Sequence, residues 1–183
     1  MIVRDARWDD APGIAAIYAH HVLHGTATFD TEAPSVDTWR AKILDISARG
    51  WPMLVSERDG VVTGYAYATQ FRDRPAYAAT CENSIYVAPD ALGGGIGSAL
   101  LRELLARASQ AGFEQMIAVI GGGEPASVAL HAKLGFAHAG RMRDVGRKFG
   151  RLLDTVYMQR TLGGGVGIWA RCQTSIQRFS TRR

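Results

Sequence analysis

The feature that most constrains this chain is a glycine-rich loop between a strand-like segment and a helix-like segment. Residues 80–88 are typical of a β-strand, which Pro89 ends. Residues 93–97 read Gly-Gly-Gly-Ile-Gly, and helical periodicity begins at residue 98. Glycines permit tight turns and close approach of a ligand to main-chain amides, which at a helix start favour phosphate. The loop therefore predicts a phosphate or pyrophosphate site, although a plain connecting turn would have the same composition.

Two common nucleotide-binding motifs do not fit this loop. A Walker A loop requires Gly-Lys followed by Ser or Thr, and residues 93–98 contain no lysine. A dinucleotide fold requires an acidic residue at the end of the next strand, whereas Glu114 precedes that strand. Both nucleotide interpretations are therefore weakened.

The rest of the pattern alternates strands with helices. Strands are expected over residues 2–6, 52–58, 61–69, 80–88, 115–120, 136–143 and 152–162. Helices are expected over about residues 10–24, 35–49, 98–111 and 126–134. An early hairpin followed by βαβ-type units indicates a mixed α/β or α+β fold, with six or seven strands.

The net charge of +4 belongs to the C-terminal end rather than to a face of the domain. Residues 163–183 hold four arginines and no acidic residue, whereas the other 17 basic residues balance the 17 acidic ones. We expect one domain over residues 1–162, followed by a basic, disordered tail over residues 163–183. Nucleic-acid binding is accordingly not expected.

The composition also bears on location and on metals. The sequence has no apolar run long enough for a transmembrane helix and no signal-peptide pattern, so we expect a cytoplasmic protein without a membrane partner. Cys81 and Cys172 have no Cys or His neighbours at metal-ligand spacing. We expect neither a disulfide framework nor a metal site.

Four segments resemble the GCN5-related N-acetyltransferase (GNAT) superfamily, and the resemblance covers about residues 1–162. They are residues 80–87, 93–97, 126–136 and 145–154. The glycine loop and Leu-Gly-Phe at 134–136 are typical of the superfamily, whereas the strand around Glu82 and Gly-Arg-Lys-Phe-Gly at 146–150 are typical of its phosphinothricin and methionine sulfoximine acetyltransferase branch. The resemblance implies a GNAT fold with about four helices, whose sheet splays open at an acetyl-CoA site after residue 88.

The resemblance also implies the cofactor contacts. Pantetheine would bond to the main chain of Ile85, Tyr86 and Val87, as an added strand would. The pyrophosphate would bind the amides of Gly93, Gly94, Gly95, Ile96, Gly97 and Ser98, with Glu124 and Lys133 as further cofactor-binding residues. The family usually has Gln or Arg at the place of Leu92, often a basic residue at that of Gly94, and Asn at that of Glu124. We expect these departures to weaken cofactor binding rather than abolish it.

Glu82 and His131 are the candidate catalytic residues. An α-amino group is largely protonated at neutral pH and must lose a proton before it attacks a thioester. The resemblance gives Glu82 the role of general base, whereas a salt-bridged strand residue is the structural alternative. His131 would donate a proton or assist the base, but its apolar neighbours are equally consistent with a core histidine.

The loop over residues 70–79 is the candidate acceptor site. Arg72 and Arg74 would clamp a carboxylate, phosphinate or sulfoximine group, unless they are ordinary solvated arginines. By family resemblance, Pro75, Ala76 and Tyr77 line the acceptor pocket.

We therefore expect an enzyme that N-acetylates a small amino-acid-like amine in detoxification, and that forms the homodimer typical of the family. Two alternatives stay open. One is a related transferase for a protein N-terminus or charged tRNA, and the other is a non-catalytic acetyl-CoA-binding module.

Overall fold

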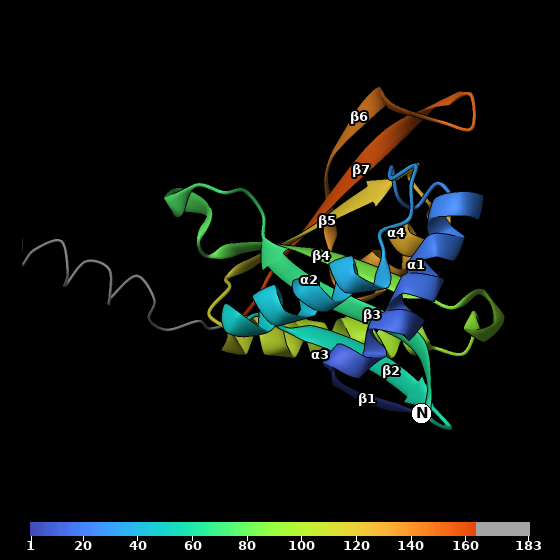
Figure 1. Cartoon of the computed structure of the whole chain (residues 1–183). Helices are drawn as coiled ribbons and strands as arrows, with labels where there is room; N and C mark the ends of the chain where they lie inside the picture. Colours follow the sequence, from blue (N-terminus) through green and yellow to red (C-terminus); the bar gives the residue numbers. More distant parts are fainter. Residues whose placement is uncertain (164–183) are drawn as a thin grey trace, which may run out of the picture.

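The computed structural model describes residues 1–163, which form a seven-stranded sheet with the order β1-β2-β3-β4-β5-β7-β6 (Figure 1). The strands are β1 (Ile2–Asp5), β2 (Met53–Arg58), β3 (Val61–Gln70), β4 (Thr80–Val87), β5 (Gln115–Gly121), β6 (Ala137–Lys148) and β7 (Arg151–Thr161). Strands β4 and β5 are parallel, and every other neighbouring pair is antiparallel. The mixed sheet predicted from the sequence is confirmed.

Four helices cover the two faces of this sheet. They are α1 (Ala11–His24), α2 (Val36–Ala48), α3 (Ile96–Gln110) and α4 (Pro125–Lys133), with short 3-10 turns at η1 (Trp8–Asp10), η2 (Pro75–Tyr77) and η3 (Pro89–Ala91). Helices α1 and α2 share one buried cluster with the sheet, whereas α3 and the apolar side chains of α4 belong to the cluster on the other face. None of the helices within residues 1–163 is long and apolar enough to span a membrane.

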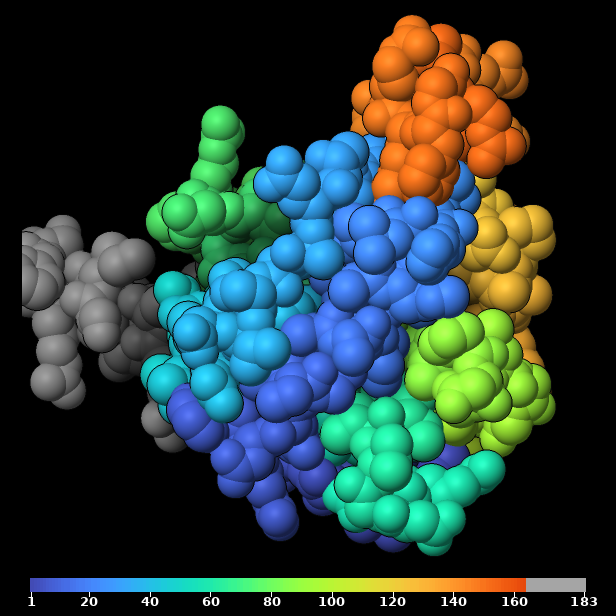
Figure 2. Space-filling view, turned by 45° about the vertical axis from the view of Figure 1, so that its right-hand side comes forward, coloured from blue at the N-terminus to red at the C-terminus, as the bar shows by residue number. Residues whose placement is uncertain are grey.

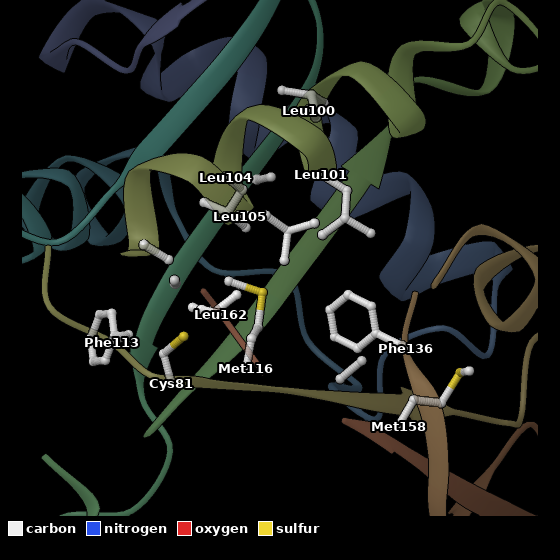
Figure 3. Close-up of a cluster of buried hydrophobic side chains, with 14 of the residues drawn as sticks. Cys81, Leu100, Leu101, Leu104, Leu105, Phe113, Met116, Phe136, Met158 and Leu162 are labelled. Carbon is white, nitrogen blue, oxygen red and sulfur yellow. The ribbon is translucent and has the colours of Figure 1, made fainter. Parts of the chain in front are cut away.

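The core beneath α3 is aliphatic. Four leucines at helical spacing pack on the sheet and are almost fully buried: Leu100, Leu101, Leu104 and Leu105. Figure 3 shows them above Cys81 of β4 and Met116 of β5, with Phe113, Phe136 and Met158 filling the same layer. This apolar face of α3 fixes the position of the helix start, and therefore of the glycine loop before it.

The core beneath α1 and α2 is aromatic instead. Tyr65 of β3 stacks between Tyr67 of the same strand and Tyr86 of β4, with ring centroids 6.4 and 5.5 Å away. Trp39 of α2 packs edge-on to Tyr65 at 5.3 Å, and Tyr18 of α1 packs edge-on to Tyr86 at 5.0 Å. These rings hold one another in place and give the adjacent cavity a rigid wall.

The sheet opens between β4 and β5. Their parallel pairing runs only from Thr80 opposite Gln115 to Asn83 opposite Ala118, after which the strands separate. On the other side β4 pairs with β3 along its whole length. The second half of β4 therefore has one free edge inside the protein.

The C-terminal strands differ most from the sequence-based expectation. Strand β6 continues to Lys148, five residues beyond the predicted end at Arg143, because two register shifts let it pass Gly140 and Gly146 without ending. The tight turn is at Phe149 and Gly150, both with positive φ, and Arg147 and Arg151 lie in the strands on either side of it. Helix α3 starts at Ile96, two residues earlier than predicted. The basic tail predicted over residues 163–183 lies, apart from Gly163, outside the described residues.

Candidate active site

A cavity of about 690 Å³ occupies the opening between β4 and β5. Its walls come from α1, the connection over residues 25–29, the glycine loop, the two separated strands and α4. Figure 2 shows two segments that project from the body of the molecule, the loop over residues 71–79 (green) and the β6–β7 hairpin (orange).

The glycine loop ends at the first turn of α3. Gly93 and Gly95 have φ values of 77° and 75°, a left-handed conformation that side chains disfavour, and Gly95 is the residue before the helix. The amides of Ile96, Gly97 and Ser98 follow it, in a helix turn whose N–H groups have no partner within the helix. All three residues line the cavity. Gly94 was predicted to belong to this set, but it is not among the residues that line the cavity.

The free edge of β4 presents the main chain of alternate residues. Two hydrogen bonds, Ala88 N to Thr63 O and Phe71 N to Thr80 O, show that even-numbered residues of β4 pair with β3. The main-chain groups of Ile85 and Val87 therefore face the opening. Tyr86 was predicted to bind the cofactor through its main chain as well, but that main chain faces β3, and its side chain lines the cavity instead.

His21 of α1 forms a hydrogen bond with one of these main-chain groups. Its Nε2 donates a hydrogen bond of 2.9 Å to the carbonyl oxygen of Val87, and the ring lines the cavity beside Tyr86. Burial lowers the pKa of His21, although the bond to Val87 acts in the opposite direction. A neutral ring with its proton on Nε2 satisfies this contact, so α1 is fastened to the end of β4.

Glu82 is at the point where the two strands separate. It lies opposite Thr69 of β3 and Ile117 of β5, lines the cavity, and leaves 32% of its side chain exposed. Burial raises the pKa of Glu82, while the positive charges of Arg72 and Lys42 oppose that rise. Nη1 of Arg72 lies 3.8 Å from Oε2 of Glu82. The carboxylate is therefore a stronger base than an exposed glutamate and is held beside a cation.

His131 is buried on the opposite wall and lines the same cavity. Its Nδ1 lies 2.7 Å from the carbonyl oxygen of Ser127, and its Nε2 lies 3.1 Å from Oδ1 of Asn83. The amide nitrogen of Asn83 donates to the carbonyl oxygen of Ile117 at 3.2 Å, which directs its oxygen toward His131. Both ring nitrogens therefore face acceptors, and burial lowers the pKa of His131. The ring bridges α4 to the last paired residue of β4.

The predicted acceptor loop lies at the mouth of the cavity rather than in its wall. Arg72, Arg74, Pro75, Ala76 and Tyr77 are not among the residues that line the cavity, and only Arg72 makes a charged contact with Glu82. The side-chain amide of Gln70 donates to the carbonyl oxygens of Arg72 and Arg74, which holds the loop in a folded turn.

Of the two remaining residues predicted to bind the cofactor, Glu124 lines the cavity and Lys133 does not. Glu124 precedes α4 and lines the cavity, as does Leu92 with 65% of its surface exposed. Lys133 ends α4, is exposed, and does not line the cavity.

Several cavity residues had no signal in the sequence. The hydroxyl of Tyr18 lies 2.7 Å from both Thr28 Oγ1 and Asp30 Oδ2, which fastens the connection after α1. Buried Lys148 donates to the carbonyl oxygen of Thr28 at 2.9 Å. The contact of Lys148 with Thr28 joins residues 120 positions apart, so no local pattern could have revealed it.

Neither a cysteine nucleophile nor a metal site is supported by the residues that the structure describes. Burial raises the pKa of the Cys81 thiol to about 12, and its sulfur lies against the carbonyl oxygen of Gln115. Within residues 1–163, no cluster of three His, Cys, Asp or Glu side chains is arranged to hold a metal ion.

A split parallel strand pair, a glycine loop at a helix start and a carboxylate at the split occur together in this cavity. The Acetyltransferase (GNAT) family model matches residues 12–136. The chain belongs to the GNAT acetyltransferase family.

Individual GNAT proteins match almost the whole described domain. A phosphinothricin N-acetyltransferase of Alcaligenes faecalis is 51% identical over 164 residues, which are 89% of this chain and 83% of the relative. A methionine sulfoximine/methionine sulfone acetyltransferase of Pseudomonas aeruginosa is 43% identical over 87% of this chain and 94% of its own. The crystal structure of a phosphinothricin acetyltransferase from Sinorhizobium meliloti with AcCoA has a TM-score of 0.87 and 48% identity, and covers 90% of both chains.

Proposed function

We propose that this GNAT enzyme transfers the acetyl group of acetyl-CoA directly to the amino group of a small amino-acid-like acceptor, of the phosphinothricin or methionine sulfoximine type. The observation that carries the proposal is the position of Glu82, at the strand split and 3.8 Å from Arg72. The names of the relatives described above support this acceptor class.

The residues of the cavity fit coenzyme A. The unpaired amides of Ile96, Gly97 and Ser98 would hold the pyrophosphate at the positive end of α3. The main-chain groups of Ile85 and the N–H of Val87 would bond to pantetheine, which would extend the sheet at the free edge of β4. When bound, acetyl-CoA supplies the acetyl group as an activated thioester.

Glu82 would act as the general base. The acceptor enters as an ammonium ion and must lose one proton before its nitrogen has a lone pair for attack. The raised pKa of Glu82 makes its carboxylate a better proton acceptor, and Arg72 keeps enough of it ionised to act near neutral pH. The proton passes to Glu82 directly or through one water molecule.

His131 would assist by holding a proton. Because Nδ1 faces the carbonyl oxygen of Ser127, a neutral ring carries its proton there and leaves Nε2 without one. A second proton on Nε2 would complete a hydrogen bond to Asn83, which offsets part of the cost of a buried charge. These two acceptors support a role for His131 in proton transfer rather than in cofactor binding.

The acceptor would lie between Glu82 and the loop over residues 71–79. Arg72 and Arg74 would attract its anionic group, and Pro75, Ala76 and Tyr77 would close over it at the mouth of the cavity. Acetylation removes the positive charge of the amine, which is consistent with detoxification of amino-acid analogues in the cytoplasm.

We also propose that the protein forms a homodimer through the β6–β7 hairpin. Four large apolar side chains on the β6–β7 hairpin are about half exposed: Met142, Val145, Phe149 and Leu152. A second copy of the chain that packs against this hairpin would remove them from water. Sedimentation of wild-type protein and of a Phe149→Ser, Leu152→Ser variant would test this, since the variant should sediment as a monomer.

The acceptor class is tested by CoA release with a panel of amines. The panel contains phosphinothricin, methionine sulfoximine, methionine, glutamate and a peptide with a free N-terminus. The proposal predicts the highest kcat/KM with phosphinothricin or methionine sulfoximine. Release only with the peptide would favour a protein acceptor instead, and acetyl-CoA binding without release for any amine would favour a non-catalytic module.

A further inference from the structure

Lys42 of α2 reaches toward the acceptor end of the cavity through Tyr67. Its Nζ donates a hydrogen bond of 2.7 Å to the hydroxyl oxygen of Tyr67. The same ammonium lies 4.3 Å from the ring centroid of Tyr67 and 5.0 Å from that of Trp39. The contact combines a hydrogen bond with cation–π attraction to two rings, so it is directional.

This contact determines which way the Tyr67 hydroxyl can donate. An ammonium group has only donors, so the tyrosine oxygen must accept and its own proton must point elsewhere. Among residues 1–163, no acceptor for that proton is in hydrogen-bond range. Tyr67 lines the cavity, so it has a donor to offer to a bound molecule.

Tyr67 and Glu82 lie on the same face of the sheet. Tyr67 is directly opposite Ser84, and Glu82 is directly opposite Thr69, one alternate position further along both strands. Tyr67 is 9% exposed, and its ring packs against Tyr65 and Trp39. Its hydroxyl is therefore held in a fixed position near the proposed base.

We propose that Lys42 and Tyr67 form a specificity element, in which the Tyr67 hydroxyl donates to the α-carboxylate of the acceptor and Lys42 orients that hydroxyl and adds positive charge. The inference rests on the proposed function, because it presumes an amino-acid acceptor whose amine is near Glu82. In an α-amino acid the carboxylate is attached to the carbon that bears the amine. A group that binds this carboxylate must therefore lie close to the base, as Tyr67 does.

The charges around the cavity agree with this role. The cations that act on Glu82 are Arg72 from the loop after β3 and Lys42 from α2, and they approach it from different elements. An acceptor with a carboxylate would lie between two positive groups, whereas an acceptor with a neutral carboxamide would gain less from them. Lys42 therefore acts on substrate choice through Tyr67, and its charge also opposes the rise that burial causes in the pKa of Glu82.

The test compares methionine sulfoximine with its α-carboxamide, because the two differ only in the anionic group. The variants are Tyr67→Phe, Lys42→Met and the double variant. Arg49→Met is the matched control. It removes a positive charge from the end of the same helix, and the guanidinium of Arg49, like the ammonium of Lys42, lies over an indole ring, that of Trp51. KM and kcat are measured for both acceptors and for acetyl-CoA, and thermal melting confirms that each variant is folded.

We expect Tyr67→Phe and Lys42→Met each to raise KM for methionine sulfoximine at least about tenfold, with little change for the carboxamide or acetyl-CoA. The increase in KM in the double variant should be smaller than the product of the two single increases, because Lys42 acts in part through that hydroxyl. Lys42→Arg, which keeps a donor and a charge, should recover part of the loss.

Two results would overturn the inference. If the variants behave like Arg49→Met, or lose the same factor with both acceptors, the pair has no role in recognising the carboxylate, although the proposed function would stand. If wild-type enzyme acetylates the carboxamide as efficiently as methionine sulfoximine, no carboxylate subsite exists. Failure of wild-type enzyme to acetylate any amino acid would instead remove the proposed function, and this inference with it.

Discussion

The side chains of His131 and Asn83 join the two walls of the cavity at the residue where β4 and β5 part. Nε2 of His131 lies 3.1 Å from Oδ1 of Asn83, and Asn83 is the last residue of β4 paired with β5. The amide of Asn83 also donates across that pairing to Ile117. His131 therefore contacts β4 at the point where the strands separate. The protonation of its ring depends on the side chain at position 83.

Replacement of that amide by a carboxylate should change the protonation of the ring. Asn83→Asp puts a negative charge beside Nε2, and an opposite charge favours the imidazolium form. The pKa of His131, which burial holds below its ordinary value, should rise by at least about one unit. NMR titration of the His131 ring carbons measures this. An unchanged or lower pKa in a folded variant would contradict the hydrogen-bond assignment.

Arg72 should set the acidic limb of the pH–rate profile. Glu82 works as a base only when ionised, and the Arg72 charge opposes the rise that burial causes in its pKa. Removal of this charge in Arg72→Met should raise the pKa of Glu82 further. The acidic limb of kcat/KM should therefore move to higher pH, while its alkaline limb stays in place.

Arg74→Met is the matched control for that experiment, because Arg74 is on the same loop and makes no charged contact with Glu82 within residues 1–163. An acidic limb that does not move in Arg72→Met, or equal shifts in both variants, would show that the 3.8 Å contact has no specific effect on the base.

Replacement of Leu92 by a basic residue should strengthen the binding of acetyl-CoA. It lines the cavity next to the glycine loop and is largely exposed, so a longer side chain there meets no steric barrier. Leu92→Arg should lower the Kd for acetyl-CoA by about threefold at low salt, the effect of one exposed charge pair, and the gain should shrink as ionic strength rises. Calorimetry measures the Kd for acetyl-CoA, with Leu92→Met as the control. A gain in affinity that does not depend on salt would contradict the charge-pair explanation.

Gly146 is required by the position of Phe29. A Cβ atom at position 146 would collide with the ring of Phe29, which belongs to the connection after α1 and lines the cavity. Gly146→Ala should destabilise the fold by about 1–3 kcal/mol, the usual effect of overpacking. Chemical denaturation measures the loss, and Phe29→Ala should remove most of it in the double variant. Equal losses with and without Phe29 would refute the contact.

The local elements of this fold could be predicted from the sequence. The glycine loop, the hairpin over residues 53–70 and Ser35 as the cap of α2 depend on turn, capping and alternation rules that act over a few residues. Asp10 precedes α1 and is of a residue type that caps helices, but its carboxylate instead accepts from the Arg4 side chain and from the Arg7 amide.

The side-chain geometry of the site could be predicted only in part. Strand alternation puts Glu82, Ser84 and Tyr86 on one face of β4, where they lie opposite Thr69, Tyr67 and Tyr65 of β3. The contacts of Lys42 with Tyr67 and of His131 with Asn83 depend on helix position and on strand register, and each joins residues at least 25 positions apart. Strand β6 was predicted as far as Arg143, but its continuation to Lys148 was missed because a register shift between Met142 and Gly146 interrupts the alternation.

The most direct measurement of the central claim is CoA release with methionine sulfoximine by wild-type enzyme and by Glu82→Gln, over a range of pH. Glutamine keeps the size of the side chain and removes the base. The general-base role of Glu82 predicts that kcat/KM falls by about a hundredfold or more and that the acidic limb disappears, while acetyl-CoA binds unchanged. A variant with the wild-type rate and the wild-type pH profile would contradict it.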